Sequence, residues 1–465
     1  MRELLVHLDR SAGRLGGQVR GGLRDAIRGG RVPPGFRMPS TRALAESLGV
    51  SRGMIVEAYE QLVAEGYLTS RHGSGTRVSA AYAATSRAES AGSPVDPAIT
   101  HDLKLGVPDL GTFPRAAWLA ATRHVLNTAP HSAFGYPGPS GAPGLRAELA
   151  EYLGRVRAAQ VRPENVVIVN GVAQGLALVS QALRGLGHDV LAVEDPSGLG
   201  QRGIFTTHGL DLTFVPCDDQ GLDVDALERS GARAVLVTPA HQYPTGVVLS
   251  PTRRAALIRW ARAHDALVVE DDYDAEFRYD RDPVGCLQGL APDHVVHVGS
   301  TSKALAPGLR LGWAVLPAAL IERVHGLKTH ADLGSAVLPQ LALARLLETG
   351  GYDRHLRAMR AHYRRRRDAV ADALAAHLPD ARVHGIAAGL HLCVELPPGA
   401  DEFATVNRAR ERGVRVDAMG PMRVGASGPA AVVIGYAASS PERLRAAMAL
   451  LGASVLPAPA APRLD

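Results

Sequence analysis

Short apolar runs that alternate with helical patterns constrain the fold of this 465-residue chain more than any other feature. The runs are mostly Val, Leu, Ile and Ala, and they lie at residues 166–169, 190–193, 212–215, 234–237, 266–269 and 295–298. Helical patterns, such as those at 175–183 and 252–263, separate them. Such a chain is expected to form a mostly parallel sheet that helices cover on both faces. Ligands of these sheets bind beyond the carboxyl ends of the strands, so chemistry should be sought directly after each run.

The first 79 residues follow a different pattern, in which three helical segments precede two short strands. Apolar residues recur every four positions across residues 15–27, which predicts a first helix. Ser40 and Ser51 are start signals for two further helices. Strands are predicted at 67–71 and 76–78, on either side of a glycine-rich tip. Together these elements predict a helix-turn-helix unit with a hairpin wing.

Positive charge is concentrated in this first unit. Residues 1–79 carry 12 arginines against 7 acidic residues, whereas the rest of the chain has 39 basic and 39 acidic residues. A basic unit joined to a neutral one indicates that the first part binds a polyanion such as double-stranded DNA. The alternative is a small helical domain without a DNA role. The arginines at 364–367 lie in a helical pattern, and we expect them to form a solvent-exposed face.

The remaining composition bounds the class of protein. The length requires more than one domain, and no stretch is long and apolar enough for a membrane span. Glu3 and Asp9 interrupt any signal-peptide core, so the protein is expected in the cytoplasm. Its three cysteines are far apart, which predicts neither a disulfide framework nor a metal site.

Residues that follow three of the apolar runs combine into a candidate ligand site. Residues 299–303 read Gly-Ser-Thr-Ser-Lys, and Arg310 comes seven positions after Lys303. These groups suit a phosphate-bearing carbonyl compound, because the hydroxyls and Arg310 would hold the phosphate while Lys303 forms an imine. Residues 170–173 open a helix whose free N–H groups attract an anion. The carboxylates at 270–272 end a buried strand, where a cationic ring nitrogen would pair with one of them.

The N-terminal unit resembles a known DNA-binding domain. Residues 38–45, 49–52, 58–62 and 65–68 are similar to the winged-helix domain of GntR-type regulators, and the similarity runs through residues 11–79 without gaps. The start of the third predicted helix can enter a major groove. The resemblance implies DNA contacts at Arg42, Ser51, Arg52, His72 and Gly73.

The second part resembles an enzyme family. Residues 300–313, which read Ser-Thr-Ser-Lys-Ala-Leu-Ala-Pro-Gly-Leu-Arg-Leu-Gly-Trp, are similar to fold-type I aminotransferases, which bind pyridoxal 5′-phosphate (PLP). The resemblance covers about residues 102–455 and implies that Lys303 binds PLP as an aldimine. It implies further cofactor contacts at Asp271, Tyr273, Ser300, Ser302, Arg310, Gly171, Val172, Ala173 and Tyr136. Tyr136 would reach the phosphate of a neighbouring subunit, whereas the other lysines, Lys104 and Lys328, are expected at the surface.

In this order the two resemblances match the MocR/PdxR subgroup of GntR-type regulators, and residues 241–246 and 270–277 are typical of it. They imply a homodimer that binds an operator with repeated half-sites. The expected fold is a mainly α winged helix-turn-helix with a β wing, followed by an α/β fold-type I aminotransferase-like domain. That domain would have a mostly parallel sheet and a small C-terminal α+β subdomain. The expected boundaries are 1–79 for the DNA-binding domain, 80–101 for a flexible linker, 102–455 for the PLP-binding effector and dimerisation domain, and 456–465 for a Pro/Ala-rich tail.

Two departures from a working transaminase favour a sensor over a catalyst. Gly198 or Leu199 stands where an aromatic ring commonly stacks on the cofactor, and Val433 stands where an arginine for the substrate α-carboxylate is expected. Arg423 and Arg202 are candidates to compensate. The leading hypothesis is a PLP-responsive transcriptional regulator of vitamin B6 or of amino-acid and amine metabolism, with an amine or amino acid as a candidate second effector. The alternatives are an active aminotransferase with a DNA-binding appendage and a DNA-binding protein with a vestigial dimerisation scaffold.

Overall fold

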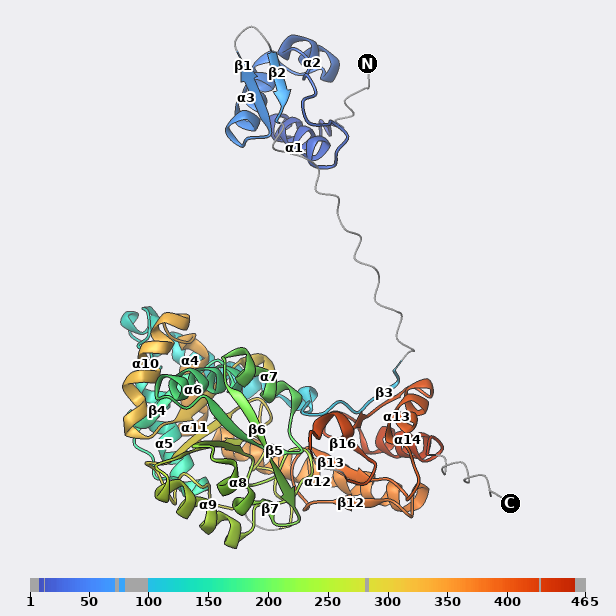
Figure 1. Cartoon of the computed structure of the whole chain (residues 1–465). Helices are drawn as coiled ribbons and strands as arrows, with labels where there is room; N and C mark the ends of the chain where they lie inside the picture. Colours follow the sequence, from blue (N-terminus) through green and yellow to red (C-terminus); the bar gives the residue numbers. More distant parts are fainter. Residues whose placement is uncertain are drawn as a thin grey trace, which may run out of the picture. The chain divides into compact units, whose positions relative to one another are not determined.

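The computed structural model describes residues 8–11, 13–71, 75–79, 99–280, 284–425 and 428–455 of the chain. The chain divides into two compact units, Met1–Val95 and Asp96–Asp465, and each is described by itself (Figure 1). Most of the predicted linker and the whole predicted tail lie outside the described residues. In the described ranges, no helix is long and apolar enough to cross a membrane.

The first unit is the predicted winged helix-turn-helix. Its elements are α1 (Leu15–Arg28), α2 (Thr41–Leu48), α3 (Arg52–Ala64), β1 (Leu68–Arg71) and β2 (Gly75–Val78). The Ser40 side chain accepts a hydrogen bond from the Ala43 N–H at 3.2 Å, and the Ser51 side chain accepts one from the Met54 N–H at 3.3 Å, so both serines cap helices as predicted. β1 and β2 form an antiparallel hairpin. The core includes Val19, Leu23, Leu44, Ile55 and Leu62.

The second unit contains a large sheet of eight strands in the order β4-β11-β10-β9-β8-β5-β6-β7. The strands are β4 (Val166–Val169), β5 (Val190–Asp195), β6 (Asp211–Asp218), β7 (Gly221–Leu222), β8 (Ala234–Val237), β9 (Leu267–Asp272), β10 (Val295–Ser300) and β11 (Gly312–Val315). The five strands from β10 to β6 are paired in parallel, which confirms the mostly parallel sheet. β11, which the sequence did not predict, runs antiparallel to both of its neighbours.

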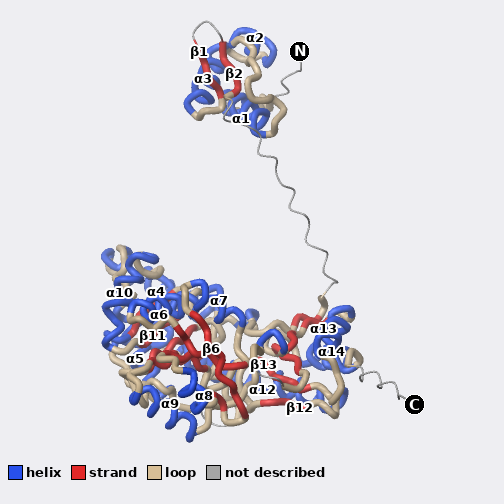
Figure 2. The backbone as a smooth tube through the Cα atoms, in the orientation of Figure 1, coloured by secondary structure: helices blue, strands red, loops and turns tan. Residues whose placement is uncertain are grey.

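Helices cover both faces of this sheet (Figure 2). They are α4 (Arg115–Thr128), α5 (Pro143–Arg157), α6 (Val172–Gly185), α7 (Leu199–Thr207), α8 (Val224–Ser230), α9 (Pro251–Ala263), α10 (Ala318–Asp332) and α11 (Val337–Glu348). Leu176 of α6, Phe205 of α7 and Leu320 of α10 pack in the core on one face. Leu227 of α8 and Leu257 of α9 pack in the core on the other. Burial on both faces explains why the parallel strands are continuously apolar.

The C-terminal part forms the expected small α+β subdomain, to which the long α12 (Gly351–His377) leads. Its elements are β12 (Arg382–His384), β13 (His391–Glu395), α13 (Glu402–Glu411), β14 (Val414–Arg415), β15 (Asp417–Ala418), β16 (Ala431–Gly435) and α14 (Pro441–Gly452). Four of the strands form an antiparallel sheet in the order β12-β13-β16-β15. The arginines at 364–367 in α12 do not all face solvent, because Arg366 is buried and pairs with Asp109 at 2.6 Å.

A short segment from the start of the second unit joins this subdomain. β3 (His101–Asp102) pairs in parallel with β14, and the Thr100 N–H donates to the Gly413 carbonyl oxygen at 2.9 Å. Thr100 and His101, which the sequence assigned to the linker, are therefore hydrogen-bonded to residues far along the chain.

Candidate functional site

A cavity of about 620 Å³ opens at the carboxyl ends of the parallel strands. Eight of the predicted cofactor residues line it, namely Val172, Ala173, Asp271, Tyr273, Ser300, Ser302, Lys303 and Arg310. They come from the turn after β4, the end of β9 and the loop after β10, so segments far apart in the sequence meet where the fold class predicts a ligand. Tyr136 is 92% exposed and does not line the cavity of its own chain.

One end of the cavity is suited to an anion. Gly171, with φ +79°, precedes α6, and no side chain caps the N–H groups of that helix. The backbone N–H groups of Val172 and Ala173 therefore lack intrahelical acceptors. Arg310 Nη2 donates to the Asn170 carbonyl oxygen at 2.7 Å, and a Cβ atom at Gly171 would lie 2.8 Å from that Nη2. Glycine lets the guanidinium approach the helix start, so a positive charge and free backbone N–H groups lie together where an anion could bind.

Asp271 provides a carboxylate in the same cavity, which suits a cationic group rather than an anion. Its Oδ2 accepts a hydrogen bond from Gln201 Nε2, whereas its buried Oδ1 has no partner among the described residues. Burial raises the pKa of Asp271 to about 7, and the nearby charge of Asp272 adds to the effect. An unpaired buried carboxylate oxygen is costly, and a protonated ring nitrogen would satisfy it. The residues present thus fit PLP, which carries such a nitrogen as well as a phosphate.

The raised pKa gives a first testable expectation. Between about pH 4, where an unfolded aspartate titrates, and about pH 7, the folded protein holds a proton that the unfolded chain has lost. The contribution of Asp271 to stability therefore falls as the pH rises through this window. Asp271→Asn is expected to raise the free energy of unfolding of the PLP-free protein by about 2–4 kcal/mol at about pH 8, and to change it little at about pH 4. Urea unfolding at both pH values measures this, with the exposed Asp189→Asn as control. Equal effects at both pH values would contradict the assignment.

Lys303 presents its amine inside the cavity. Its Nζ donates to the Gly106 carbonyl oxygen at 2.6 Å. Burial lowers the pKa of Lys303, although the charges of Asp274 and Asp271 oppose the shift. A lower pKa increases the fraction of neutral amine, which is the form that attacks a carbonyl carbon. Gly106 is a contact that the sequence did not reveal, because it lies 197 positions from the lysine.

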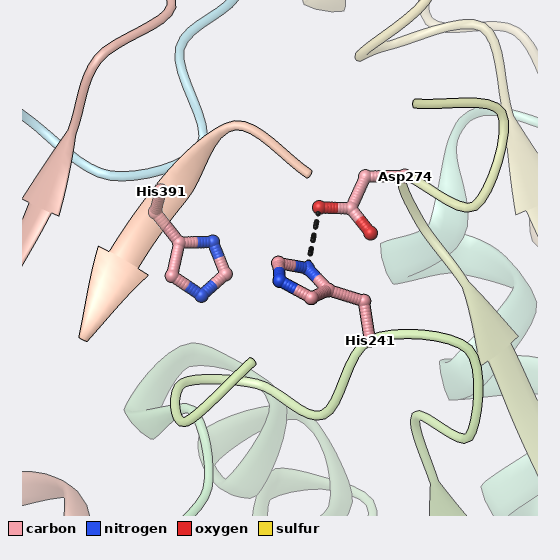
Figure 3. Close-up of side chains that lie close together, drawn as sticks. All are labelled: His241, Asp274 and His391. Carbon is pink, nitrogen blue, oxygen red and sulfur yellow. Dashed lines mark hydrogen bonds and ion pairs between the residues drawn. The ribbon is translucent and has the colours of Figure 1, made fainter. Parts of the chain in front are cut away.

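A cluster of aromatic and acidic side chains supports Tyr273. The Tyr273 hydroxyl donates to the His241 carbonyl oxygen at 2.9 Å, and His241 Nδ1 lies 3.0 Å from Asp274 Oδ2. Figure 3 shows His241 between Asp274 and His391. These three side chains offer ligand atoms within 4.8 Å of one another, but His241 and Asp274 already bond to each other, and His391 Nε2 lies 3.2 Å from the Pro244 carbonyl oxygen. We interpret the cluster as a hydrogen-bonded brace for the tyrosine.

The structure also shows what surrounds the two positions at which the sequence differs from a working transaminase, the missing stacking ring and the missing carboxylate arginine. A Cβ atom at Gly198 would lie 3.2 Å from Tyr243, whose ring lines the cavity and occupies the space beside this glycine. Val433 is fully buried in a small apolar cluster. Neither compensating arginine lines the cavity: Arg202 Nε donates to Ser197 Oγ at 3.0 Å, and Arg423 Nη1 donates to the Gly428 carbonyl oxygen at 3.3 Å.

Lys328 is not at the surface, contrary to expectation. Its side chain is fully buried and pairs with Asp332 at 2.6 Å. Asp332 Oδ2 also accepts hydrogen bonds from Gln174 Nε2 at 2.8 Å and from Asn170 Nδ2 at 3.1 Å. The lysine therefore neutralises a half-buried acid that holds the turn in front of α6. Lys104 is exposed as expected, although it stands at the wall of the cavity.

The first unit carries its own candidate site. Arg42, Ser51 and Arg52 are exposed and lie at the amino ends of α2 and α3. Arg52 Nε donates to Thr41 Oγ1 at 3.4 Å, which brings the two helix starts together. The other two predicted DNA contacts, His72 and Gly73, lie outside the described residues.

Comparisons with known proteins cover both units. The model "Bacterial regulatory proteins, gntR family" matches residues 15–78, and "Aminotransferase class I and II" matches residues 100–451. The chain is 33% identical to the "HTH-type pyridoxine biosynthesis transcriptional regulator PdxR" of Corynebacterium glutamicum, over 93% of this chain and 94% of that protein. It is 30% identical to the "Probable rhizopine catabolism regulatory protein MocR" of Rhizobium meliloti, over 95% and 96%. Among solved structures, the α-aminoadipate aminotransferase LysN of Thermus thermophilus, in complex with N-(5′-phosphopyridoxyl)-L-leucine, is 28% identical with a TM-score of 0.68, over 76% of this chain and 91% of that one.

Proposed function

Since the chain belongs to the MocR/PdxR-type transcriptional regulators, with a GntR-type DNA-binding domain before an aminotransferase domain, we propose that PLP is the ligand to which it responds. In this proposal PLP is held covalently by Lys303 and alters the binding of a homodimer to an operator with repeated half-sites. The regulated genes would serve vitamin B6 or amino-acid and amine metabolism, in line with the relative named for pyridoxine biosynthesis.

The observation that carries the proposal is the unpaired, buried Oδ1 of Asp271 in the same cavity as the Lys303 amine. PLP supplies an aldehyde, a protonated ring nitrogen and a phosphate. Lys303 would bind the first and Asp271 the second, while Arg310 and the free N–H groups of α6 would hold the third. The Tyr273 hydroxyl would contact the ring hydroxyl.

An active transaminase has less support. In the described part of the chain, Arg310 supplies the only guanidinium that lines the cavity, and the phosphate would occupy it. A substrate α-carboxylate would then have no bidentate partner to orient it.

Exposed apolar side chains support the homodimer. Leu119 and Leu126 of α4, Phe134 beside Tyr136, and Leu338 of α11 are 38–57% exposed. Both α4 and the turn that contains Phe134 contact α11. A second subunit would remove this apolar surface from water and would give Tyr136 a partner.

A titration with PLP tests the proposal. Absorbance of the lysine-bound cofactor and fluorescence anisotropy of labelled DNA from upstream of the gene would be read in the same samples. We expect both signals to change over the same PLP concentrations. Uptake of PLP without any change in DNA binding would overturn the proposal, as would a failure to take up PLP.

The segment 100–106 connects the cofactor cavity with the linker, and through it cofactor binding would change the contacts near the linker. It begins at the β3–β14 pairing and ends at Gly106, whose carbonyl accepts the hydrogen bond from Lys303. Covalent capture of the aldehyde would leave the Lys303 nitrogen with at most one N–H and would direct it toward the cofactor. The hydrogen bond to Gly106 would then be lost, so cofactor binding would release this end of the segment.

Gly106→Ala is expected to mimic this release. A Cβ atom there would lie 2.9 Å from Lys303 Nζ, and its φ of +70° disfavours any side chain. We expect the DNA binding of the PLP-free variant to resemble that of the PLP-bound wild type. The ratio of the Kd values for DNA with and without PLP should therefore be at least about threefold smaller in the variant than in the wild type. Anisotropy titrations with and without PLP measure this. The control is Gly187→Ala, which has a φ of +84° but no atom within 4 Å of the added Cβ. An unchanged response in Gly106→Ala would exclude this route.

A further inference from the structure

Asp417 places a carboxylate at the wall of the cofactor cavity, away from the groups assigned to PLP. It begins β15 and pairs across the strands with Val433 of β16. Tyr243, Met422 and Leu105 line the cavity with it. The carboxylate therefore stands in a largely apolar part of the cavity, beside the valine where an aminotransferase is expected to carry its carboxylate-binding arginine.

This carboxylate lacks a partner in the described part of the chain. Asp417 makes no side-chain hydrogen bond or ion pair with any of the residues that the structure describes. Burial raises its pKa, and the positive charges of Arg415 and Lys104 only partly offset the effect. Arg415 pairs instead with the exposed Asp102 at 3.1 Å. A half-buried acid without a counter-ion favours a cationic ligand group next to it.

Three of the other charged residues of the cavity already have a role in the proposed function. Lys303, Asp271 and Arg310 would bind the aldehyde, ring nitrogen and phosphate of PLP. Asp417 and the exposed Lys104 remain, and they do not pair with each other. Of these two, Asp417 is the more buried, so its charge is less screened by water. A ligand that reaches past the cofactor would therefore meet a negative charge.

We propose that Asp417 selects a second effector that carries two basic nitrogens, as a diamine does, and that it holds the cationic nitrogen while the other reacts at the cofactor. This inference rests on the proposed function, because it requires PLP on Lys303. The reacting amine replaces the Lys303 nitrogen on the aldehyde carbon: its C–N bond forms, the bond to Lys303 breaks, and two protons pass to the lysine nitrogen. No oxidant or reductant is needed.

Three amines of equal carbon number test whether the second functional group of the ligand affects binding. Putrescine has a second amine, n-butylamine has none, and γ-aminobutyrate has a carboxylate. Calorimetric titration into the PLP-loaded full chain is expected to give putrescine a Kd at least about 10-fold below that of γ-aminobutyrate, with n-butylamine between them. Asp417→Asn is expected to bring the three values within about threefold. The same ligands are then tested for their effect on DNA anisotropy.

The matched control is Asp102→Asn, which removes a carboxylate close to Asp417 in the fold but outside the cavity, and it should keep the preference for putrescine. Tighter binding of γ-aminobutyrate, abolished by Lys104→Met, would overturn the inference and make Lys104 the counter-ion. Equal binding of putrescine and n-butylamine would overturn it as well. In both cases a PLP-dependent change in the DNA binding of the wild type, measured first, leaves the proposed function standing, whereas failure to take up PLP overturns both.

Discussion

Lys303→Ala is expected to weaken PLP binding at least about 100-fold and to remove the effect of PLP on DNA binding. The variant loses the covalent bond, and the ligand is left with hydrogen bonds and ion pairs that its phosphate and ring nitrogen also make with water. Absorbance titration and borohydride reduction followed by peptide mapping measure the loss. In the wild type, the reduced cofactor should remain on the peptide that contains Lys303.

Two further lysine variants separate the roles of this residue. Lys303→Arg keeps a donor that can reach the Gly106 carbonyl but cannot bond to the aldehyde, so it should lose PLP binding while its DNA binding stays like that of the PLP-free wild type. Lys104→Ala removes a lysine at the cavity wall that does not touch the cofactor in the proposed function, and it should keep the reduced label on Lys303. Label on another peptide in the wild type would refute the assignment of Lys303.

Arg157→Leu is expected to lower the free energy of unfolding of the second unit by about 3–5 kcal/mol. The guanidinium is 2% exposed and holds Asp272 through two hydrogen bonds, at 2.8 Å to Oδ2 and 3.0 Å to Oδ1. It also donates to the Val284 carbonyl oxygen. Its removal deprives the buried Asp272 of two hydrogen bonds. Among the described residues it leaves His297, 3.7 Å from Asp272 and 3.3 Å from Glu270, as the ion-pair partner of these two acids.

The neighbouring Arg155 is a matched control. It is 55% exposed and pairs with Asp353 at 2.7 Å, so Arg155→Leu should cost less than about 1 kcal/mol. Urea unfolding followed by circular dichroism, without PLP, compares the two variants. Losses of equal size would mean that Arg157 does not act through its buried ion pair.

The sequence predicted the parallel strands well, because strands covered on both faces are continuous apolar runs. The apolar run of β9 stops at Val269, but the strand continues through Glu270, Asp271 and Asp272, the three carboxylates that the sequence placed at its end. It did not predict β11, whose Gly312 and Trp313 follow the candidate ligand-binding residues 299–310 and resemble part of a loop. Pairing with β4 and β10, rather than local preference, makes this segment a strand.

The candidate cofactor residues could be predicted because they occur in short motifs at strand ends, and the fold brings those ends together. Residues that act through contacts between distant segments carried no such signal. Gly106 meets Lys303 only in the folded chain, and Asp417 reaches the cavity only because β15 pairs with β16. The burial of Lys328 was not predicted for the same reason. One of the groups that accept hydrogen bonds from its buried amine is Gln174, which is 154 positions away.

The pairing of β3 with β14 has a practical consequence for isolating the effector part of this regulator. A truncated protein that starts at residue 102, the boundary predicted from the sequence, would lack Thr100 and His101 and would leave Val414 of β14 without its strand partner. A truncation at Asp96, the first residue of the second unit, retains the whole strand. Recombinant fragments for biochemical work should therefore begin at that residue, so that the C-terminal subdomain keeps its native edge.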